Sequence, residues 1–256
     1  MASIIPQVVG IYRAAGYETI SGFSSYHFFN AGEAPFTFFL RGQQTVGCLG
    51  LALQEVMFLE NFRDYLAPRR VLVIGNAFGW STVALALIFP QAKTLAIDID
   101  ASGVQFTNEL IDCNHLSARA VVAESPTGVA GAVEKQLGGP VDFCLIDAMH
   151  DNQSLMADFG AVHAVAASDA FVLCHDVINW HMIDGVKQIE AQYKLKSKLL
   201  TRTPSGMALI YSLLNPAFES YLDCFSDPPE RFHLLRQFFL ANHADPIARF
   251  MAGYRP

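Results

Sequence analysis

The sequence has a shortage of basic residues and no long hydrophobic run, and both features narrow what the protein can do. Its 256 residues include 17 lysines and arginines against 24 aspartates and glutamates, which gives a formal net charge of −7. Domains that bind nucleic acid usually carry a basic face, so no nucleic-acid partner is expected. The longest unbroken apolar run, residues 83–89, is far shorter than the roughly 20 residues needed to cross a bilayer. No membrane partner is expected either.

Closely spaced cysteine pairs and a leader pattern are also missing from the sequence. The cysteines are scattered along the chain at Cys48, Cys113, Cys144, Cys174 and Cys224. Cys144 and Cys174 lie in strand-like apolar runs, where a cysteine behaves as a small buried hydrophobic residue rather than as a disulfide partner or zinc ligand. The first residues lack a basic segment followed by a long apolar one, so no secretory signal is expected. These features predict a cytoplasmic protein.

By composition the chain divides into an aromatic-rich segment (1–68), a middle region (69–213) and a C-terminal extension (214–256). The first segment carries aromatic stretches, such as residues 26–30, that fit a lid over a substrate or a surface packed on the core or on a second subunit. The last contains a Phe- and Leu-rich helical pattern at 230–242, which fits a core or an interface better than a binding site. We therefore expect helical additions on both sides of a catalytic domain, and the apolar flanks favour a homodimer.

The middle region alternates apolar strands with helices. The strand-like runs that helical patterns separate are residues 71–74, 94–98, 120–123, 141–146 and 170–174. Such an alternation indicates a parallel sheet that helices cover on both faces. Two further runs, 198–201 and 207–212, lie close together around Pro204-Ser-Gly206 and predict a hairpin. The expected fold class is α/β: a doubly wound, mostly parallel seven-stranded sheet closed by an antiparallel hairpin.

A turn with two glycines joins the first strand of this region to its helix. At Gly75 and Gly79 the backbone can pass close to a ligand, and the helix that follows offers free N–H groups at its start. Ligands of doubly wound folds lie beyond the carboxyl ends of the strands. Asp98 ends the second strand, where a carboxylate can accept hydrogen bonds from the hydroxyls of a ribose. The loop and the carboxylate together predict a cofactor that contains a nucleoside.

This part of the chain resembles the class I S-adenosylmethionine-dependent methyltransferases. The run Val71-Leu-Val-Ile-Gly-Asn-Ala-Phe-Gly-Trp-Ser-Thr82 looks like their first motif, and the resemblance covers about residues 45–212. It implies that the loop passes under the methionine part of the cofactor, that Asp98 holds the ribose and that Glu124-Ser125 lies beside the adenine. The cofactor-binding residues expected on this basis are Gly75, Asn76, Ala77, Gly79, Ser81, Asp98, Glu124, Ser125 and Asp147.

A nicotinamide-dependent oxidoreductase is an alternative interpretation of the same loop. Such an enzyme would favour a tighter G-x-G-x-x-G pattern, which the spacing of Gly75 and Gly79 does not supply. The closing hairpin also favours the methyltransferase. Two positions depart from the methyltransferase pattern, because Val73 stands where an acidic residue is frequent and Ala77 where a glycine is usual.

Acidic and imidazole side chains follow the fourth and fifth strands of the middle region. Asp147 and His150 come after the fourth strand, and His175-Asp176 ends the fifth. Because neighbouring parallel strands lie about 4.8 Å apart, Asp147, His175 and Asp176 can converge on one cation. Carboxylate oxygens suit Mg²⁺ or Mn²⁺, and an added imidazole would also tolerate a softer transition metal. The alternative is that Asp147 and Asp176 merely cap the following helix and turn.

The same end of the sheet looks like the metal-dependent O-methyltransferases, particularly the branch related to macrolide sugar methyltransferases. In that branch an Asp-x-x-His run follows the fourth strand, which here is Asp147 to His150. The resemblance implies that Asp147 binds the metal and that His150 removes the proton from the substrate hydroxyl. Two acidic residues commonly follow the fifth strand in this branch, whereas His175 takes the place of the first here.

The expected function is therefore metal-assisted O-methylation of a hydroxylated small molecule. Methyl transfer needs an oxygen nucleophile in line with the sulfonium carbon and little covalent work from the protein. A cation lowers the pKa of the substrate hydroxyl, and a histidine takes up its proton near neutral pH. The sequence leaves open whether the acceptor is a sugar, a polyketide, a phenol or another metabolite. A cofactor-binding relative that does not transfer methyl groups, either hydroxylase-like or regulatory, is the other alternative.

Overall fold

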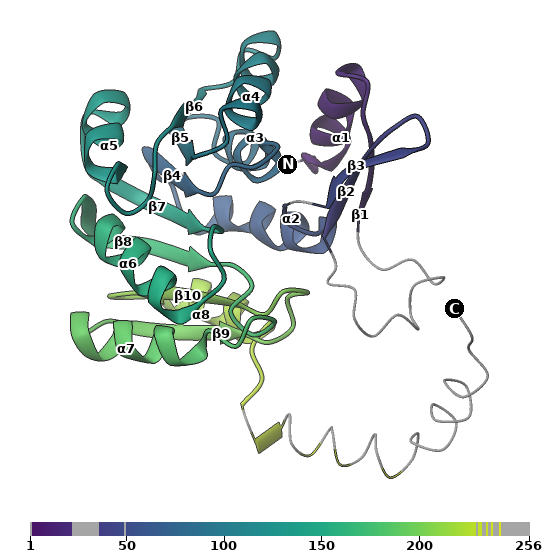
Figure 1. Cartoon of the computed structure of the whole chain (residues 1–256). Helices are drawn as coiled ribbons and strands as arrows, with labels where there is room; N and C mark the ends of the chain where they lie inside the picture. The colour runs from purple at the N-terminus through teal and green to yellow at the C-terminus, as the bar shows by residue number, and fades with distance from the viewer. Residues whose placement is uncertain are drawn as a thin grey trace.

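The computed structural model describes residues 2–21, 36–48 and 50–228, together with residues 230, 231, 234, 237 and 241. The aromatic stretch at 26–30 lies outside the described residues, and the helical pattern expected at 230–242 lies mostly outside them. Figure 1 shows a central twisted sheet between two layers of helices, with a small N-terminal sheet beside it. No helix in the described part of the chain combines the length and the apolar character needed to span a membrane.

The N-terminal segment contains a small antiparallel sheet that the sequence-based expectation of a helical segment missed. Its strands pair in the order β1-β2-β3, between one helix that precedes them and one that follows. Phe39 of β2 is fully buried against Tyr12 of the first helix, with ring centroids 5.1 Å apart. The elements are α1 (Ile5–Ala14), β1 (Glu18–Ser21), β2 (Thr37–Arg41), β3 (Gln44–Cys48), α2 (Leu53–Glu60) and the 3-10 helix η1 (Asn61–Asp64).

The main sheet has seven strands in the order β6-β5-β4-β7-β8-β10-β9, which confirms the predicted fold class. The strands are β4 (Arg70–Ile74), β5 (Lys93–Asp98), β6 (Ala118–Val122), β7 (Val141–Ile146), β8 (Ala166–Cys174), β9 (Lys196–Leu200) and β10 (Met207–Tyr211). β4 to β8 run parallel, whereas β10 pairs antiparallel with both β8 and β9. The hairpin therefore closes one edge of the sheet, as its spacing around Gly206 predicted.

Helices cover both faces of this sheet because each strand sends alternate side chains to opposite sides. In β4, Val71 and Val73 join the apolar cluster that contains α2, α3 and α8, whereas Leu72 and Ile74 join the cluster that contains α5, α6 and α7. The helices are α3 (Trp80–Ile88), α4 (Ala101–Cys113), α5 (Val129–Leu137), α6 (Asn152–His163), α7 (Ile183–Tyr193) and α8 (Pro216–Asp223). α8 is the part of the expected C-terminal helical extension that the structure describes.

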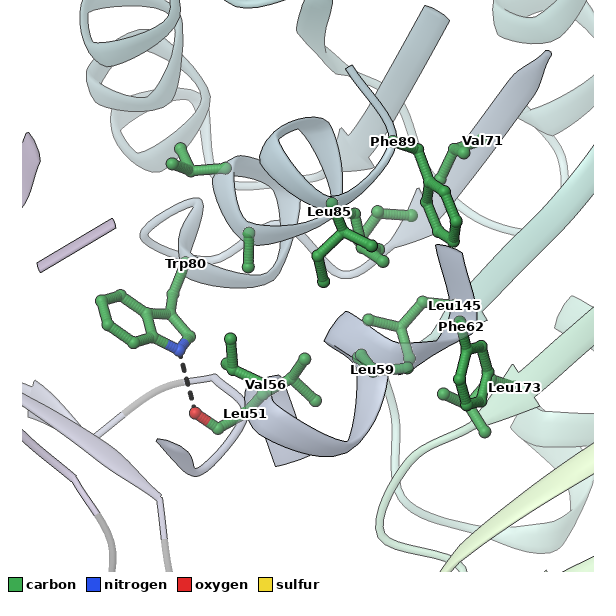
Figure 2. Close-up of a cluster of buried hydrophobic side chains, with 14 of the residues drawn as sticks. Leu51, Val56, Leu59, Phe62, Val71, Trp80, Leu85, Phe89, Leu145 and Leu173 are labelled. Carbon is green, nitrogen blue, oxygen red and sulfur yellow. Dashed lines mark hydrogen bonds between the residues drawn. The ribbon is translucent and has the colours of Figure 1, made fainter. Parts of the chain in front are cut away.

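The core fixes α2 firmly on the sheet (Figure 2). Leu51, Val56, Leu59 and Phe62 are all fully buried. Trp80 donates a hydrogen bond from its indole nitrogen to the carbonyl of Leu51 at 2.9 Å. Each such apolar side chain stabilises the fold by about 1.5–3 kcal/mol relative to an exposed position, so the docking of α2 is a large share of a typical total stability. α2 is thereby held beside the carboxyl ends of the strands.

Candidate active site

A cavity of about 550 Å³ opens at the carboxyl ends of β4, β5, β7 and β8. This is the position that the doubly wound topology predicts for a ligand. With the exception of Gly79, all the residues expected at the site line this cavity. They are Gly75, Asn76, Ala77, Ser81, Asp98, Glu124, Ser125, Asp147, His150, His175 and Asp176. The fold thus brings the expected cofactor residues and the expected catalytic residues to one place.

The glycine loop between β4 and α3 lies against the end of β7. Gly75 has a φ of +91°, which favours glycine, and a Cβ there would collide with the main-chain carbonyl of Asp147. Gly79, with a φ of +78°, precedes α3, and a side chain at this position would overlap Thr107 of α4. Gly79 therefore serves helix packing, whereas Gly75 lets the loop reach the floor of the cavity.

Asp98, at the end of β5, holds this loop in place. Its Oδ2 accepts hydrogen bonds from the main-chain N–H groups of Asn76 and Ala77, both at 2.7 Å, and its Oδ1 accepts one from Asp100 at 2.9 Å. A carboxylate has about four acceptor positions, so one on Oδ1 is left for a ligand. The side chain of Asn76 is engaged within the loop, where its amide hydrogen-bonds to Thr107 and accepts from Thr82.

A buried carboxylate that the sequence did not reveal faces the far end of the cavity. Asp158 of α6 is only 4% exposed, lines the cavity and accepts a hydrogen bond from Ser125 Oγ at 2.5 Å. Its burial raises the pKa of the carboxyl group, which the hydrogen bond from Ser125 opposes in part. The signal in the sequence was its spacing, because Leu155, Phe159 and Val162 place it on the buried face of α6.

Asp147, His175 and Asp176 converge beside the glycine loop. β7 and β8 are in register at their ends, with Ile146 opposite Cys174, so the residues that follow these strands are neighbours. One donor atom from each of the three side chains lies within 4.8 Å of the others. His175 Nδ1 is 3.1 Å from Asp147 Oδ1 and 3.4 Å from Asp176 Oδ2. The structure thus gathers the three predicted metal ligands.

His150 lies over the same two carboxylates. Its Nε2 is 3.3 Å from Asp176 Oδ2 and 3.6 Å from Asp147 Oδ1. Despite these short distances Nε2 is buried without a well-oriented hydrogen bond in the described structure. Its ring stacks on the half-exposed Trp180, with ring centroids 5.2 Å apart and an angle of 14° between the rings. The expected base is therefore in the cluster, and an exposed aromatic surface adjoins it.

Glu55 of α2 is the second carboxylate that the sequence did not reveal. It is fully buried, and its Oε2 lies 3.0 Å from Nε2 of His175. Burial by itself would raise the pKa of Glu55, but the charge of His175 and hydrogen bonds from His175 and Ser205 lower it. The pattern was readable in part, since Glu55 precedes Phe58 and Leu59 at the spacing of the buried face of α2.

The charges of this cluster shift one another's pKa. Burial would lower the pKa of His175, but the negative charges of Asp147 and Glu55 raise it well above its usual value. Burial would raise the pKa of Asp147, but the charge of His175 and its hydrogen bond with His175 hold it well below its usual value. The cluster therefore shifts the pKa of the imidazole upward and those of Asp147 and Glu55 downward, which favours the charged form of each group.

Comparisons with known proteins agree with this geometry. The sequence profile of a family described as a methyltransferase domain matches residues 72–177. No protein of curated function matches the chain in sequence. The cofactor-bound protein Rv0187 from MTB is similar in structure, with a TM-score of 0.58 and 17% identity over 84% of this chain and 92% of that one.

Two structures of O-methyltransferases are also similar to the structure of this chain. That from Bacillus cereus, in complex with SAH, has a TM-score of 0.56 and 15% identity over 83% of this chain and 92% of that one. TomG from Streptomyces achromogenes, involved in tomaymycin synthesis and in complex with SAM, has a TM-score of 0.54 and 14% identity over 83% of this chain and 90% of that one. Residues 72–177 therefore match the methyltransferase-domain family, and the described chain shares the Rossmann-like fold of these solved methyltransferase structures.

Proposed function

We propose that the protein methylates a hydroxyl group of a small molecule, using S-adenosylmethionine (SAM) and a bound metal ion. The observation that carries this proposal is a single cavity shared by two sets of residues. Gly75 and Asp98 belong to the proposed nucleoside-binding site, and Asp147, His150 and Asp176, which line the same cavity beside it, form the proposed proton-accepting and cation-binding cluster. The similar folds named as O-methyltransferases in complex with SAH or SAM support the same assignment.

The cofactor would lie along the glycine loop. When bound, SAM supplies a methyl group that passes to the acceptor oxygen as its C–S bond breaks, which leaves S-adenosylhomocysteine (SAH). Asp98 offers its remaining acceptor position to the ribose, and Gly75 lets the chain pass beneath the methionine part. Ser125 and Asp158 lie where the adenine is expected, and the second oxygen of Asp158 can accept a hydrogen bond from an amino group.

A metal ion fits the cluster on two grounds. Two carboxylates and an imidazole present donor atoms within 4.8 Å of one another, which is a chemically sound ligand set. In addition, Nε2 of His150 is buried close to the carboxylates of Asp147 and Asp176 but has no hydrogen-bond partner in the described structure. Asp147, His175 and Asp176 would hold the ion. When bound it would polarise the acceptor hydroxyl as a Lewis acid.

His150 is the proposed base, which takes the proton of the acceptor hydroxyl as the new O–C bond forms. Because the ring is held by Trp180 on one face and lies against Asp176, its orientation is restricted. The exposed part of Trp180, together with the exposed Met149, offers an apolar surface on which the carbon skeleton of the acceptor can pack. The predicted homodimer and cytoplasmic location stay predictions.

Transfer of a labelled methyl group tests the proposed reaction. The protein is incubated with methyl-labelled SAM, a divalent cation and hydroxylated acceptors, each paired with its own methoxy derivative as the control without a free hydroxyl. We expect label in the free hydroxyl compounds alone, recovered as an O-methyl ether together with an equal amount of SAH. Label recovered on nitrogen, carbon or sulfur would contradict the proposal.

A further inference from the structure

A fully buried glutamate reaches the cluster from outside the segment that matches the methyltransferase family. Glu55 belongs to α2, 120 residues before its partner His175, and the family profile begins only at residue 72. α2 is fixed by the core shown in Figure 2, so Glu55 cannot turn away without disturbing that packing. Its oxygens accept hydrogen bonds from Ala52 N–H at 2.9 Å, from Ser205 N–H at 2.9 Å and from Ser205 Oγ at 2.5 Å.

These partners determine which nitrogen of His175 carries a hydrogen toward Glu55. A main-chain N–H can only donate, and each oxygen of Glu55 already accepts from one, that of Ala52 or that of Ser205. Both oxygens therefore act as acceptors, and Nε2 of His175 donates its hydrogen to Oε2. The other nitrogen, Nδ1, is the one that faces Asp147 and Asp176.

This is the arrangement by which proteins orient a histidine that ligates a metal. Such a histidine donates its second N–H to a carboxylate or carbonyl, which fixes the tautomer and the direction of the ring. Stability alone is a weak reason for the arrangement, because apolar residues of similar volume often stabilise a protein as well as a buried ion pair does. Orientation of His175 therefore accounts for the placement of Glu55 better than stability alone does.

We infer that Glu55 is a positioning residue that holds His175 Nδ1 as a metal ligand and thereby makes the site selective for a first-row transition ion such as Co²⁺ or Zn²⁺ over Mg²⁺. The inference rests on the metal site of the proposed function. Mg²⁺ prefers an all-oxygen shell, whereas imidazole suits the softer ions. With His175 in the place of a carboxylate, the site has one nitrogen and two carboxylate ligands.

Titration of the metal-free full-length protein with Co²⁺, Zn²⁺ and Mg²⁺ tests this without any activity measurement. Calorimetry gives the affinities, and the visible absorption of Co²⁺ reports ligation by nitrogen. We expect Co²⁺ to bind at least about 10-fold more tightly than Mg²⁺. Glu55→Gln should weaken Co²⁺ binding by about 10- to 100-fold, the usual effect of losing an orienting partner, and should change the Co²⁺ spectrum.

Glu60→Gln is the matched control. Glu60 is also buried on α2, but its Oε1 accepts hydrogen bonds from Ser3 Oγ and Ile4 N–H, and none of these residues lines the cavity. This variant should leave Co²⁺ affinity unchanged. If Glu55→Gln fails to fold, Ser205→Ala provides the test, because it removes the hydroxyl donor to Glu55 and keeps the main-chain one. It should weaken Co²⁺ binding by about 3- to 10-fold.

Three results would overturn the inference: equal or tighter binding of Mg²⁺, unchanged Co²⁺ affinity in a folded Glu55→Gln protein, or no metal binding at about 1 mM. The last would contradict the metal part of the proposed function as well. SAH titrated into the same samples separates these failures from a failure of cofactor binding. SAH binding without metal selectivity would contradict only the role of Glu55.

Discussion

Replacing Asp98 by alanine should weaken SAH binding by about 100-fold. Asp98 has one acceptor position left for the ribose, and a hydrogen bond to a carboxylate contributes about 1.5–3 kcal/mol, or roughly 10- to 150-fold in affinity. The same change also frees the N–H groups of Asn76 and Ala77, so the loop loses the anchor that shapes it. Calorimetric titration of SAH into the wild type and the variant measures the effect.

Asp112→Ala is the matched control for this change. Asp112 is exposed in the last turn of α4, so its replacement removes the same charge without touching the loop. It should bind SAH as the wild type does. If the Asp98 variant remained folded and kept wild-type affinity, the assignment of the cofactor to this loop would be wrong.

Replacing His150 by alanine should lower the rate of methyl transfer by about 100- to 10,000-fold, the range for loss of a positioned base. SAH affinity should stay nearly unchanged, because His150 lies over the carboxylates rather than on the loop beside Asp98. Single-turnover transfer with saturating SAM, measured beside SAH titration, separates the two quantities. A rate that survives the change would exclude His150 as the base.

His163→Ala serves as the control for the His150 variant. His163 is an exposed histidine at the C-terminal end of α6, where it contacts Phe159 and Tyr193 rather than the cavity. Its loss should change neither the transfer rate nor the SAH affinity. A comparable drop in both variants would point to general damage to the protein instead of the loss of a base.

The parts of the fold that local sequence determines were predictable. Each of the five parallel strands contains an apolar run that is visible in the sequence, and the turn residues around Gly206 indicate the hairpin. The glycine loop lies between β4 and α3, as its glycines predicted. The exact ends of the strands were less predictable. β8 begins at Ala166, four residues before the apolar run that the sequence shows, and these first residues are partly or fully exposed and therefore not uniformly apolar. Pairing with β7 near Val141 extends the strand there.

Features that depend on distant contacts were not predictable in the same way. The N-terminal sheet forms because β1 and β2 pair although fifteen residues separate their facing ends, Ser21 and Thr37. Glu55 looks like an ordinary helix residue until its partner His175, far along the chain, is placed beside it. Asp158 and Ser125 likewise come together only when α6 packs under the turn after β6. A single sequence contains no record of such pairings.

Departures from the family pattern proved informative once the structure placed them. His175 stands where the first of two carboxylates is common in the branch that the chain resembles, and Glu55 lies 3.0 Å from its Nε2. A carboxylate from another element, α2, therefore contacts this histidine. Glu55 also accepts a hydrogen bond from Ser205, in the turn between β9 and β10. Both α2 and this turn therefore contact the residues at the carboxyl ends of the strands.

Calorimetric titration of SAH into the purified full-length protein tests the central claim most directly. The account predicts one binding site per chain with a micromolar dissociation constant, in line with the cavity that Gly75 and Asp98 line. The absence of binding up to about 1 mM SAH, with and without added metal, would contradict it.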